Sequence, residues 1–153
     1  RDYFVGSDLI HVDGNYYFGW GKRTAVKSQD HLKKFLGETL IDFKITDHKF
    51  DHLDKCIGPL NENTALCYFE ALNMIEQAKV CYHFPNTIPI NDSDAQLFAT
   101  SFIKIKNDLI FPEGISESLK GKIVELGFKV HLLNVDEYLK AGQGIRSLAL
   151  IIE

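Results

Sequence analysis

Sulfur is scarce in this sequence. It contains a single methionine and three cysteines, Cys56, Cys67 and Cys81. The cysteines are odd in number, and no two of them have the Cys-x-x-Cys spacing. This pattern argues against a disulfide-stabilised scaffold and is typical of a reducing compartment. We therefore expect a cytoplasmic protein.

Long apolar runs and an excess of positive charge are also missing. No stretch reaches the roughly 18 apolar residues of a membrane-spanning helix, and the start lacks the layout of a signal peptide. The formal net charge is −4, and lysine and arginine are scattered along the chain. We therefore expect no membrane and no nucleic-acid partner. The first residue is Arg1 rather than methionine, which indicates a trimmed, processed or incomplete chain.

The length and composition fit one folded unit. The chain has 153 residues, of which 45% are hydrophobic, and no shift in composition marks a boundary within it. That is enough apolar material for one core. We therefore treat residues 1–153 as a single domain.

Strand and helix patterns alternate along the chain. Asp13-Gly14-Asn15 between two β-prone runs predicts a hairpin, which Gly19-Trp20-Gly21 would end, and Asn107-Asp108 marks another hairpin. Asn91-Asp92-Ser93 predicts a helix start, and Gly37 and Gly127 predict helix ends. Helices are expected at residues 24–36, 70–79, 95–99, 115–126 and 135–140, and further strands at 39–45, 64–69, 80–84, 128–133 and 147–152.

The order hairpin, helix, strand recurs three times along the chain. Its period is about 50 residues, which is typical of a propeller or an array of repeats. The repeated segments share almost no sequence identity, so the repeat rests on the pattern of elements alone. The fold class that follows is α/β.

One stretch concentrates chemically active side chains. Residues 50–58 place His52, Asp51, Asp54, Lys55 and Cys56 between apolar neighbours. If the segment is extended, His52 and Asp54 point to the same face. An imidazole beside a carboxylate can move a proton and hold a cation at one site. Two readings stay open from this stretch alone: the wall of a pocket, or a solvated loop.

Three separated motifs follow one another along the chain. The first is Val5-Gly6-Ser7-Asp8, followed by Gly21-Lys22-Arg23-Thr24. The second is His52-Leu53-Asp54, followed by Gly58-Pro59-Leu60, and the third is the segment 139–148 around Gly142-Gln143-Gly144. Their order and spacing resemble the guanidine-modifying superfamily, which includes dimethylarginine dimethylaminohydrolase, arginine deiminase and the amidinotransferases. The resemblance implies an α/β propeller (pentein fold) of five ββαβ units. This chain would supply about three of them, the C-terminal part.

The resemblance also implies roles for individual residues. His52 would be the general acid and base, and Asp54 would hold the guanidinium group. Arg23 would bind the substrate carboxylate, for which an arginine fork is a good physical fit. Asp8 and Gly144 would complete the substrate-binding set. The implied partner is a small guanidino compound such as arginine or a methylated arginine, and no cofactor is implied.

Two departures from the family pattern bear on activity. The nucleophilic cysteine of the family falls on Ser147, and the acid that opens its first motif falls on Val5. A serine hydroxyl is a far weaker nucleophile than a thiolate unless a dedicated base activates it. We therefore expect a catalytically impaired hydrolase or amidinotransferase relative. Whether the family reaction would be hydrolysis or amidino transfer stays open.

Other readings were weighed against this one. His48 and His52 are four residues apart near Asp51, Asp54 and Cys56, but the segment before them alternates like a strand, so we expect no metal site. The alternative functions are a non-catalytic member that binds a ligand or a partner, and a structural subunit. Three units would leave apolar surface and strand edges open, so we expect either a homo-oligomer or N-terminal units supplied from elsewhere.

Overall fold

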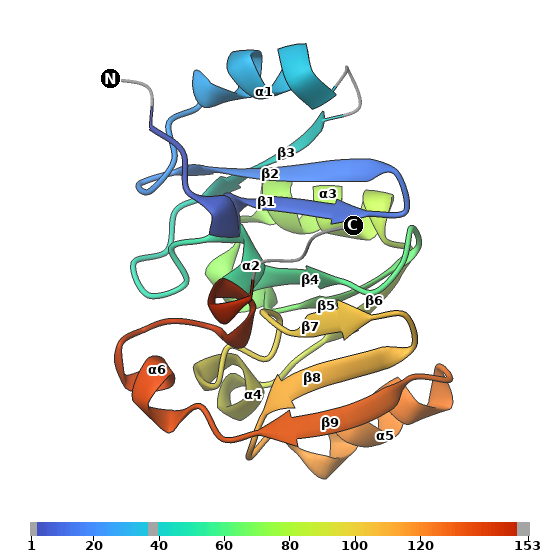
Figure 1. Ribbon diagram of the computed structural model, residues 1–153. Coiled ribbons are helices and arrows are strands. Elements are labelled where there is room, and N and C mark those ends of the chain that lie inside the picture. Colours follow the sequence, from blue (N-terminus) through green and yellow to red (C-terminus); the bar gives the residue numbers. More distant parts are fainter. Residues whose placement is uncertain (1–2, 37–39, 150–153) are drawn as a thin grey trace.

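Residues 3–36 and 40–149, which the computed structural model describes, contain three copies of a strand–strand–helix–strand unit (Figure 1). The units are β1 (Leu9–Val12), β2 (Asn15–Gly21), α1 (Ser28–Leu36) and β3 (Leu40–Ile45); β4 (Ile57–Pro59), β5 (Thr64–Cys67), α3 (Met74–His83) and β6 (Asn86–Pro89); and β7 (Ile103–Ile105), β8 (Asp108–Pro112), α5 (Glu117–Glu125) and β9 (Lys129–Leu133). Shorter elements join them: η1 (Gly6–Asp8), α2 (Leu53–Cys56), η2 (Phe69–Ala71), α4 (Asp92–Gln96), α6 (Asp136–Lys140) and η3 (Ile145–Leu148).

Each unit forms its own small mixed sheet. The first two strands pair antiparallel as a hairpin, and the third returns through the helix to lie parallel to the second. The same order recurs in the sheets of β4–β6 and β7–β9. A helix between parallel strands is the connection that such a sheet requires. The predicted α/β fold of repeated ββαβ units is therefore confirmed.

Local turn and cap chemistry fixes many element boundaries. Asp13 and Gly14 both have positive φ, 49° and 80°, as the two central residues of a type I′ hairpin turn require. Asn91 caps α4 by accepting a hydrogen bond from the Asp94 amide, and Gly127, with φ of 87°, follows α5. The hairpin at residues 13–15 and these two helix boundaries were predicted correctly.

The segment around residue 80 was predicted wrongly. Residues 80–84 were expected to be a strand, but α3 continues to His83 and the strand is β6. Val80 and Phe84 are four residues apart, and both side chains are fully buried. Burial at helical spacing outweighs the β-preference of this segment. Asn73 caps the start of α3 by accepting hydrogen bonds from the amides of Ile75 and Glu76.

Several further boundaries differ from the predictions. The helix expected from residue 70 begins at Met74, and the helix expected at residues 95–99 is α4, Asp92–Gln96. The helix expected from residue 24 begins at Ser28, and β2 continues through the glycines that were expected to break it. Gly19 serves close packing within the strand rather than ending it. A Cβ atom at this position would lie 2.7 Å from Cβ of Leu53 and 3.0 Å from Oδ1 of Asp8. The predicted end of α1 at Gly37 and the start of the next strand at Thr39 lie outside the described residues.

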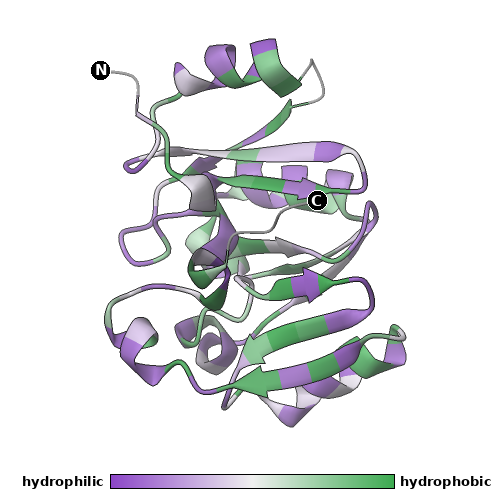
Figure 2. Ribbon diagram, viewed as in Figure 1, coloured by the Kyte–Doolittle hydropathy of each residue, from purple (hydrophilic) through white to green (hydrophobic). Residues whose placement is uncertain are grey.

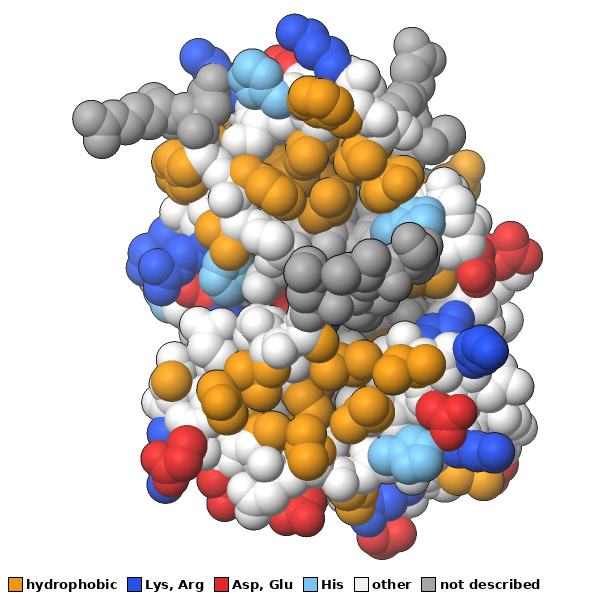
Figure 3. All heavy atoms as spheres, viewed as in Figure 1, with side chains coloured by type: hydrophobic (Ala, Val, Ile, Leu, Met, Phe, Trp, Pro, Cys, Tyr) orange, Lys and Arg blue, Asp and Glu red, His pale blue; other side chains and the backbone are white. Residues whose placement is uncertain are grey.

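A shared core joins the three units. Phe43, Leu66, Phe84 and Phe111 are fully buried members of one apolar cluster. Figure 2 shows hydrophobic residues concentrated in the strands. Apolar side chains also reach the surface, and Figure 3 shows them gathered over the sheet of β1–β3 and over the sheet of β7–β9. Among the described helices, none combines the length and apolar character needed to cross a membrane.

Candidate active site

The stretch of dense polar residues is buried. Every residue from Phe50 to Leu60 has little exposed surface, so a solvated loop is excluded. Leu53–Cys56 form the single turn of α2, and His52 precedes it in an extended conformation (φ −130°, ψ 153°). We considered an extended segment that contains both His52 and Asp54. That geometry is wrong, because His52 is extended but Asp54 lies in the helical turn. The helical turn directs the carboxylates of this stretch to different surroundings.

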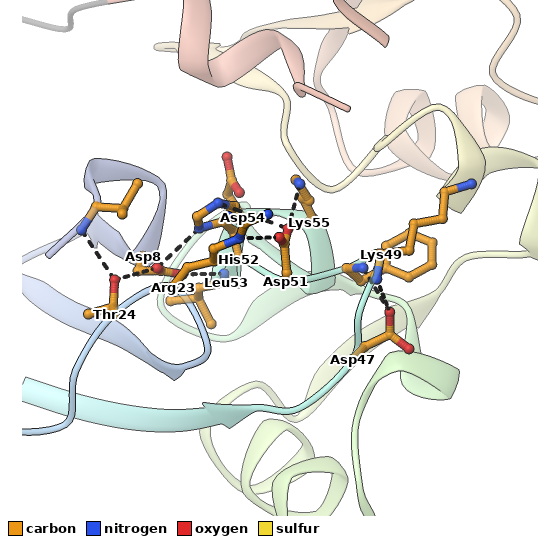
Figure 4. A network of polar contacts seen from close by, with 12 residues as sticks. Asp8, Arg23, Thr24, Asp47, Lys49, Asp51, His52, Leu53, Asp54 and Lys55 are labelled. Atoms are coloured by element: carbon orange, nitrogen blue, oxygen red, sulfur yellow. Dashed lines mark hydrogen bonds and ion pairs between the residues drawn. The ribbon is translucent and has the colours of Figure 1, made fainter. Parts of the chain in front are cut away.

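Asp8 is the centre of a buried hydrogen-bond network around His52 (Figure 4). Its Oδ2 atom lies 3.1 Å from Nδ1 of His52 and accepts a hydrogen bond of 2.6 Å from Oγ1 of Thr24. Its Oδ1 atom accepts a hydrogen bond of 2.8 Å from the Leu53 amide. A carboxylate on Nδ1 orients the ring and leaves Nε2 available. These contacts add an orienting role to the substrate-binding role predicted for Asp8.

Asp51, the residue before His52, forms ion pairs with two cationic side chains. It accepts hydrogen bonds from Nε of Arg23 at 2.5 Å and from Nζ of Lys55 at 2.7 Å. Burial raises the pKa of Asp51, but the bonds from Lys55 and Arg23 outweigh burial and hold its pKa below the ordinary value. Nε2 of His52 lies 3.9 Å from Oδ1 of Asp51. Half of the Arg23 side chain (54%) remains exposed.

Asp54 is an incompletely bonded buried acid. It is 2% exposed, and Oδ2 accepts a hydrogen bond of 2.8 Å from Oγ of Ser101. Oδ1 is buried and has no hydrogen-bond partner among the described residues. Burial raises the pKa of Asp54 to about 6, although the Ser101 bond and the charge of Arg146 act to lower it. A buried acceptor without a donor is a candidate for ligand binding.

A pocket of about 520 Å³ opens beside these groups. Arg23 and His52 line it, so the structure brings two of the predicted site residues to one cavity. Asp8, Asp54, Gly144 and Ser147 are not among its lining residues. Several of the other lining residues carry a cation or an amide. The full set of these other residues is His48, Lys49, Asp51, Lys55, Gln96, Phe98, Leu139, Lys140, Ala141, Gly142 and Gln143.

Ser147 lies in the 3-10 turn η3, which contacts η1, the turn that carries Asp8. It was expected at the start of a strand, and this expectation is wrong for residues 147–149, whereas residues 150–152 lie outside the described part of the chain. The Ser147 side chain is exposed, and its Oγ donates a hydrogen bond of 2.6 Å to the Gly144 carbonyl. The contact between η1 and η3 brings the first and third sequence motifs together.

Several site residues were not assigned from the sequence. Asp51 and Lys55 were visible in the dense stretch, but only Lys55 lies in α2, so their ion pair follows from the turn at His52 rather than from helical i, i+4 spacing. Ser101 and Arg146 gave no such signal, because their link to Asp54 depends on the tertiary fold. Cys56 donates to the carbonyls of Phe50 and His52, and burial raises its pKa, so it cannot serve as an accessible thiolate.

No group of three or more His, Cys, Asp and Glu side chains that could hold a metal ion occurs within residues 3–36 and 40–149.

Comparison with known sequences finds enzymes that act on arginine derivatives. No family model matches the chain. It is 30% identical over 149 residues to the bifunctional arginine dihydrolase/ornithine cyclodeaminase ArgZ of Synechocystis sp., covering 95% of the chain and 21% of that protein. It is 23% identical over 145 residues to N(G),N(G)-dimethylarginine dimethylaminohydrolase of Mycobacterium tuberculosis, covering 95% of the chain and 48% of that protein. The chain thus spans between a fifth and a half of these relatives.

Solved structures of related enzymes have the same fold as this chain. The N-terminal domain of ArgZ, a cyanobacterial arginine dihydrolase crystallised as a Cys-to-Ser variant with substrate, has a TM-score of 0.87 at 29% identity, over 94% of this chain and 54% of that one. A dimethylarginine hydrolase of Pseudomonas aeruginosa, a Cys-to-Ser variant with citrulline, has a TM-score of 0.75 at 23% identity, over 92% and 52%. The chain is therefore a homologue of the arginine dihydrolase ArgZ and has the pentein fold that ArgZ and the dimethylarginine dimethylaminohydrolases share.

Proposed function

We propose that this chain binds a guanidino compound of the arginine type beside His52, and that hydrolysis is impaired because serine stands at position 147. The observation that carries the proposal is the buried Oδ1 atom of Asp54, which accepts no hydrogen bond from the described residues. A guanidinium group offers five N–H donors in a planar fork and a positive charge. It therefore supplies both the donor and the charge that this carboxylate lacks.

The distribution of charge around the pocket supports an amino-acid ligand rather than a simple cation. Arg23, Lys49 and Lys140 line the pocket, whereas Asp54 and Asp8 are buried and are not among its lining residues. A ligand with a cationic head and an anionic tail would match this arrangement at both ends. Arg23 is the best partner for a carboxylate tail, because its guanidinium can form two parallel hydrogen bonds.

The chemistry at Ser147 supports binding with little turnover. In the family reaction a nucleophile attacks the guanidinium carbon, and the imidazole passes a proton to the departing amine. Oγ of Ser147 donates to the Gly144 carbonyl and has no acidic neighbour at Val5. His52 would have to take the serine proton and also protonate the amine. General acid–base help of about 10²–10⁴-fold does not replace a thiolate.

Calorimetric titration tests the binding proposal. Arginine, methylated arginines and citrulline are titrated into the parent chain and into Asp54→Ala. We expect arginine to bind the parent about ten- to a hundredfold more tightly than Asp54→Ala, because a charge-assisted hydrogen bond is lost. Citrulline, which carries no positive charge, should bind more weakly than arginine. Thr100→Val is the control, since it removes a neighbouring buried hydroxyl that bonds to no described residue.

Two outcomes would contradict this function. Equal and measurable affinity in the parent and in Asp54→Ala would remove Asp54 as the guanidinium ligand. No binding of any guanidino compound would favour the alternatives, a partner-binding member or a structural subunit.

The three free cysteines support the further proposal of a cytoplasmic location.

We also infer that residues 1–153 form the C-terminal part of a five-bladed propeller. The chain aligns with 54% of the ArgZ N-terminal domain, and exposed apolar side chains such as Ile105, Leu132 and Leu133 lie on the sheet of β7–β9. Natural proteins usually cover such a surface with another unit or a second copy. Solution scattering together with intact mass tests this. A well-packed monomer of 17.4 kDa with no further chain would contradict it.

A further inference from the structure

Ser101 lies between the buried acid Asp54 and the segment that carries Ser147. It is fully buried, in the connection between α4 and β7. Its hydroxyl donates to Oδ2 of Asp54 at 2.8 Å, and its carbonyl accepts a hydrogen bond of 3.0 Å from the Arg146 amide. One residue thus bonds to both parts of the site.

Two glycines from the sequence motifs make room for this residue and its neighbour. A Cβ atom on Gly144 would lie 2.3 Å from Oγ of Ser101, and a Cβ atom on Gly58 would lie 2.3 Å from the Thr100 carbonyl oxygen. Real Cβ atoms do not approach other atoms so closely, so only glycine fits at either position. Residues 100 and 101 are therefore held between β4 and the start of η3.

The turn before Ser101 fixes its direction. The Ser101 amide donates to the Phe98 carbonyl at 2.8 Å, which closes a turn over residues 98–101. Phe98 has a φ of 51°, which is uncommon for an aromatic residue, and its side chain lines the pocket. Nζ of Lys55 lies 5.1 Å from the centre of the Phe98 ring. The same short turn therefore presents Phe98 to the pocket and Ser101 to Asp54.

We propose that Ser101 is a positioning residue, which fixes the Asp54 carboxylate relative to the Gly144–Ser147 segment and keeps it ready to receive a guanidinium group. The part of this inference that concerns the ligand rests on the proposed function. The Ser101 hydroxyl fixes the Asp54 carboxylate by donating a hydrogen bond to Oδ2. This bond favours the charged form of Asp54 and leaves Oδ1 for the ligand.

The titration of Asp54 in the ligand-free chain tests the inference. The ¹³C chemical shift of its carboxyl carbon is followed against pH in the parent, in Ser101→Ala and in the matched control Thr100→Val. Loss of the one hydrogen bond that residues 3–36 and 40–149 donate to this carboxylate should move the titration of Ser101→Ala upward by about one pH unit. Thr100→Val should titrate like the parent, because the Thr100 hydroxyl has no hydrogen-bond partner among the described residues.

A purely structural serine would behave differently. It would lower the melting temperature on substitution while leaving the Asp54 titration unchanged, and that result would overturn the inference. If Ser101→Ala does not fold, Ser101→Cys keeps the side chain's position with a weaker donor, and it should shift the titration upward by less. A Ser101→Cys titration equal to that of the parent would also overturn the inference.

Arginine binding then separates this inference from the function on which it rests. In the parent, affinity should fall as the pH drops through about 6, where Asp54 becomes neutral. In Ser101→Ala the same loss should begin about one pH unit higher. If arginine binds the parent at no pH, the proposed function fails, while the carboxyl titration still decides the role of Ser101.

Discussion

Asp8 and His52 lie 44 residues apart in the chain, and Oδ2 of Asp8 is 3.1 Å from Nδ1 of His52. A carboxylate can only accept a hydrogen bond, so the proton of the neutral ring is on Nδ1. Nε2 is then the nitrogen that can accept or deliver a proton at the pocket. This relationship gives the histidine a defined chemical direction before any ligand binds.

Asp8→Asn should change which nitrogen of His52 carries the proton. The asparagine amide can present an N–H group to Nδ1, so the neutral ring should shift toward the tautomer protonated at Nε2. The ¹⁵N chemical shifts of the His52 ring report the two tautomers directly. Thr24→Val is the control, because it removes another hydrogen bond to the same Oδ2 atom but keeps the charge. An unchanged tautomer in Asp8→Asn would contradict the assigned role of Asp8.

Asp54→Asn should stabilise the folded chain near neutral pH. The folded state holds the Asp54 proton more tightly than the unfolded state, since the pKa rises from 3.8 to about 6. The stability that this proton contributes is present below the unfolded pKa and is lost as the pH rises through about 6. The charged form thus costs up to about 3 kcal/mol above that pH. The asparagine carries no such charge and avoids this cost.

Urea denaturation at pH 4, 5, 6, 7 and 8 measures this effect. The gain in unfolding free energy from Asp54→Asn should grow between about pH 4 and 6 and stay constant above. The exposed Asp30 offers a comparison, and Asp30→Asn should change stability by less than about 0.5 kcal/mol. A destabilised Asp54→Asn at pH 7 would show that the charged carboxylate is better compensated than its surroundings indicate.

Lys55→Met should destabilise the chain strongly. Among the described residues, it leaves Asp51, which is 5% exposed, with the partly exposed Arg23 as its one hydrogen-bonded cation. Removing one partner of a buried ion pair typically costs about 3–5 kcal/mol, because a buried charge loses its compensation. The exposed pair of Lys140 and Glu137 is the control, and Lys140→Met should cost less than about 0.5 kcal/mol. Similar losses in both variants, measured by urea denaturation, would contradict this account of Asp51.

The sequence predicts those parts of the fold that local chemistry decides. Asp13-Gly14 specifies its hairpin because the turn needs two residues with positive φ, and Asn91 specifies a helix start because its side chain caps the next turn. The end of α3 could not be predicted in this way. Val80 stays helical because it packs in the core, as does Phe84 directly after the helix, and that packing cannot be read from the local sequence.

The candidate site likewise has parts that the sequence motifs indicate and parts that only the tertiary structure reveals. The motifs name His52 and Asp8 for one site, and in the structure Oδ2 of Asp8 lies 3.1 Å from Nδ1 of His52. The substrate roles of these residues and of Asp54 stay predictions. The motifs do not reveal that Ser101 bonds to Asp54 across 47 residues, since a single serine in a connecting segment carries no pattern. They also place Asp8 with the substrate, a role that stays a prediction, and they do not reveal that its oxygens accept hydrogen bonds from Thr24 and Leu53.

Ser147→Cys supplies the family nucleophile at its position in η3, and it should restore little activity alone. The thiol would lie in an exposed turn that contacts η1, where Val5 provides no acid to orient the substrate or the histidine. The double variant Ser147→Cys with Val5→Glu should therefore exceed either single variant. Citrulline release from arginine and methylated arginines is the measurement, with the remaining propeller units present. Robust turnover by the parent serine form would show that the chain is not impaired. A double variant that neither binds nor converts any guanidino compound would argue against this class of substrate.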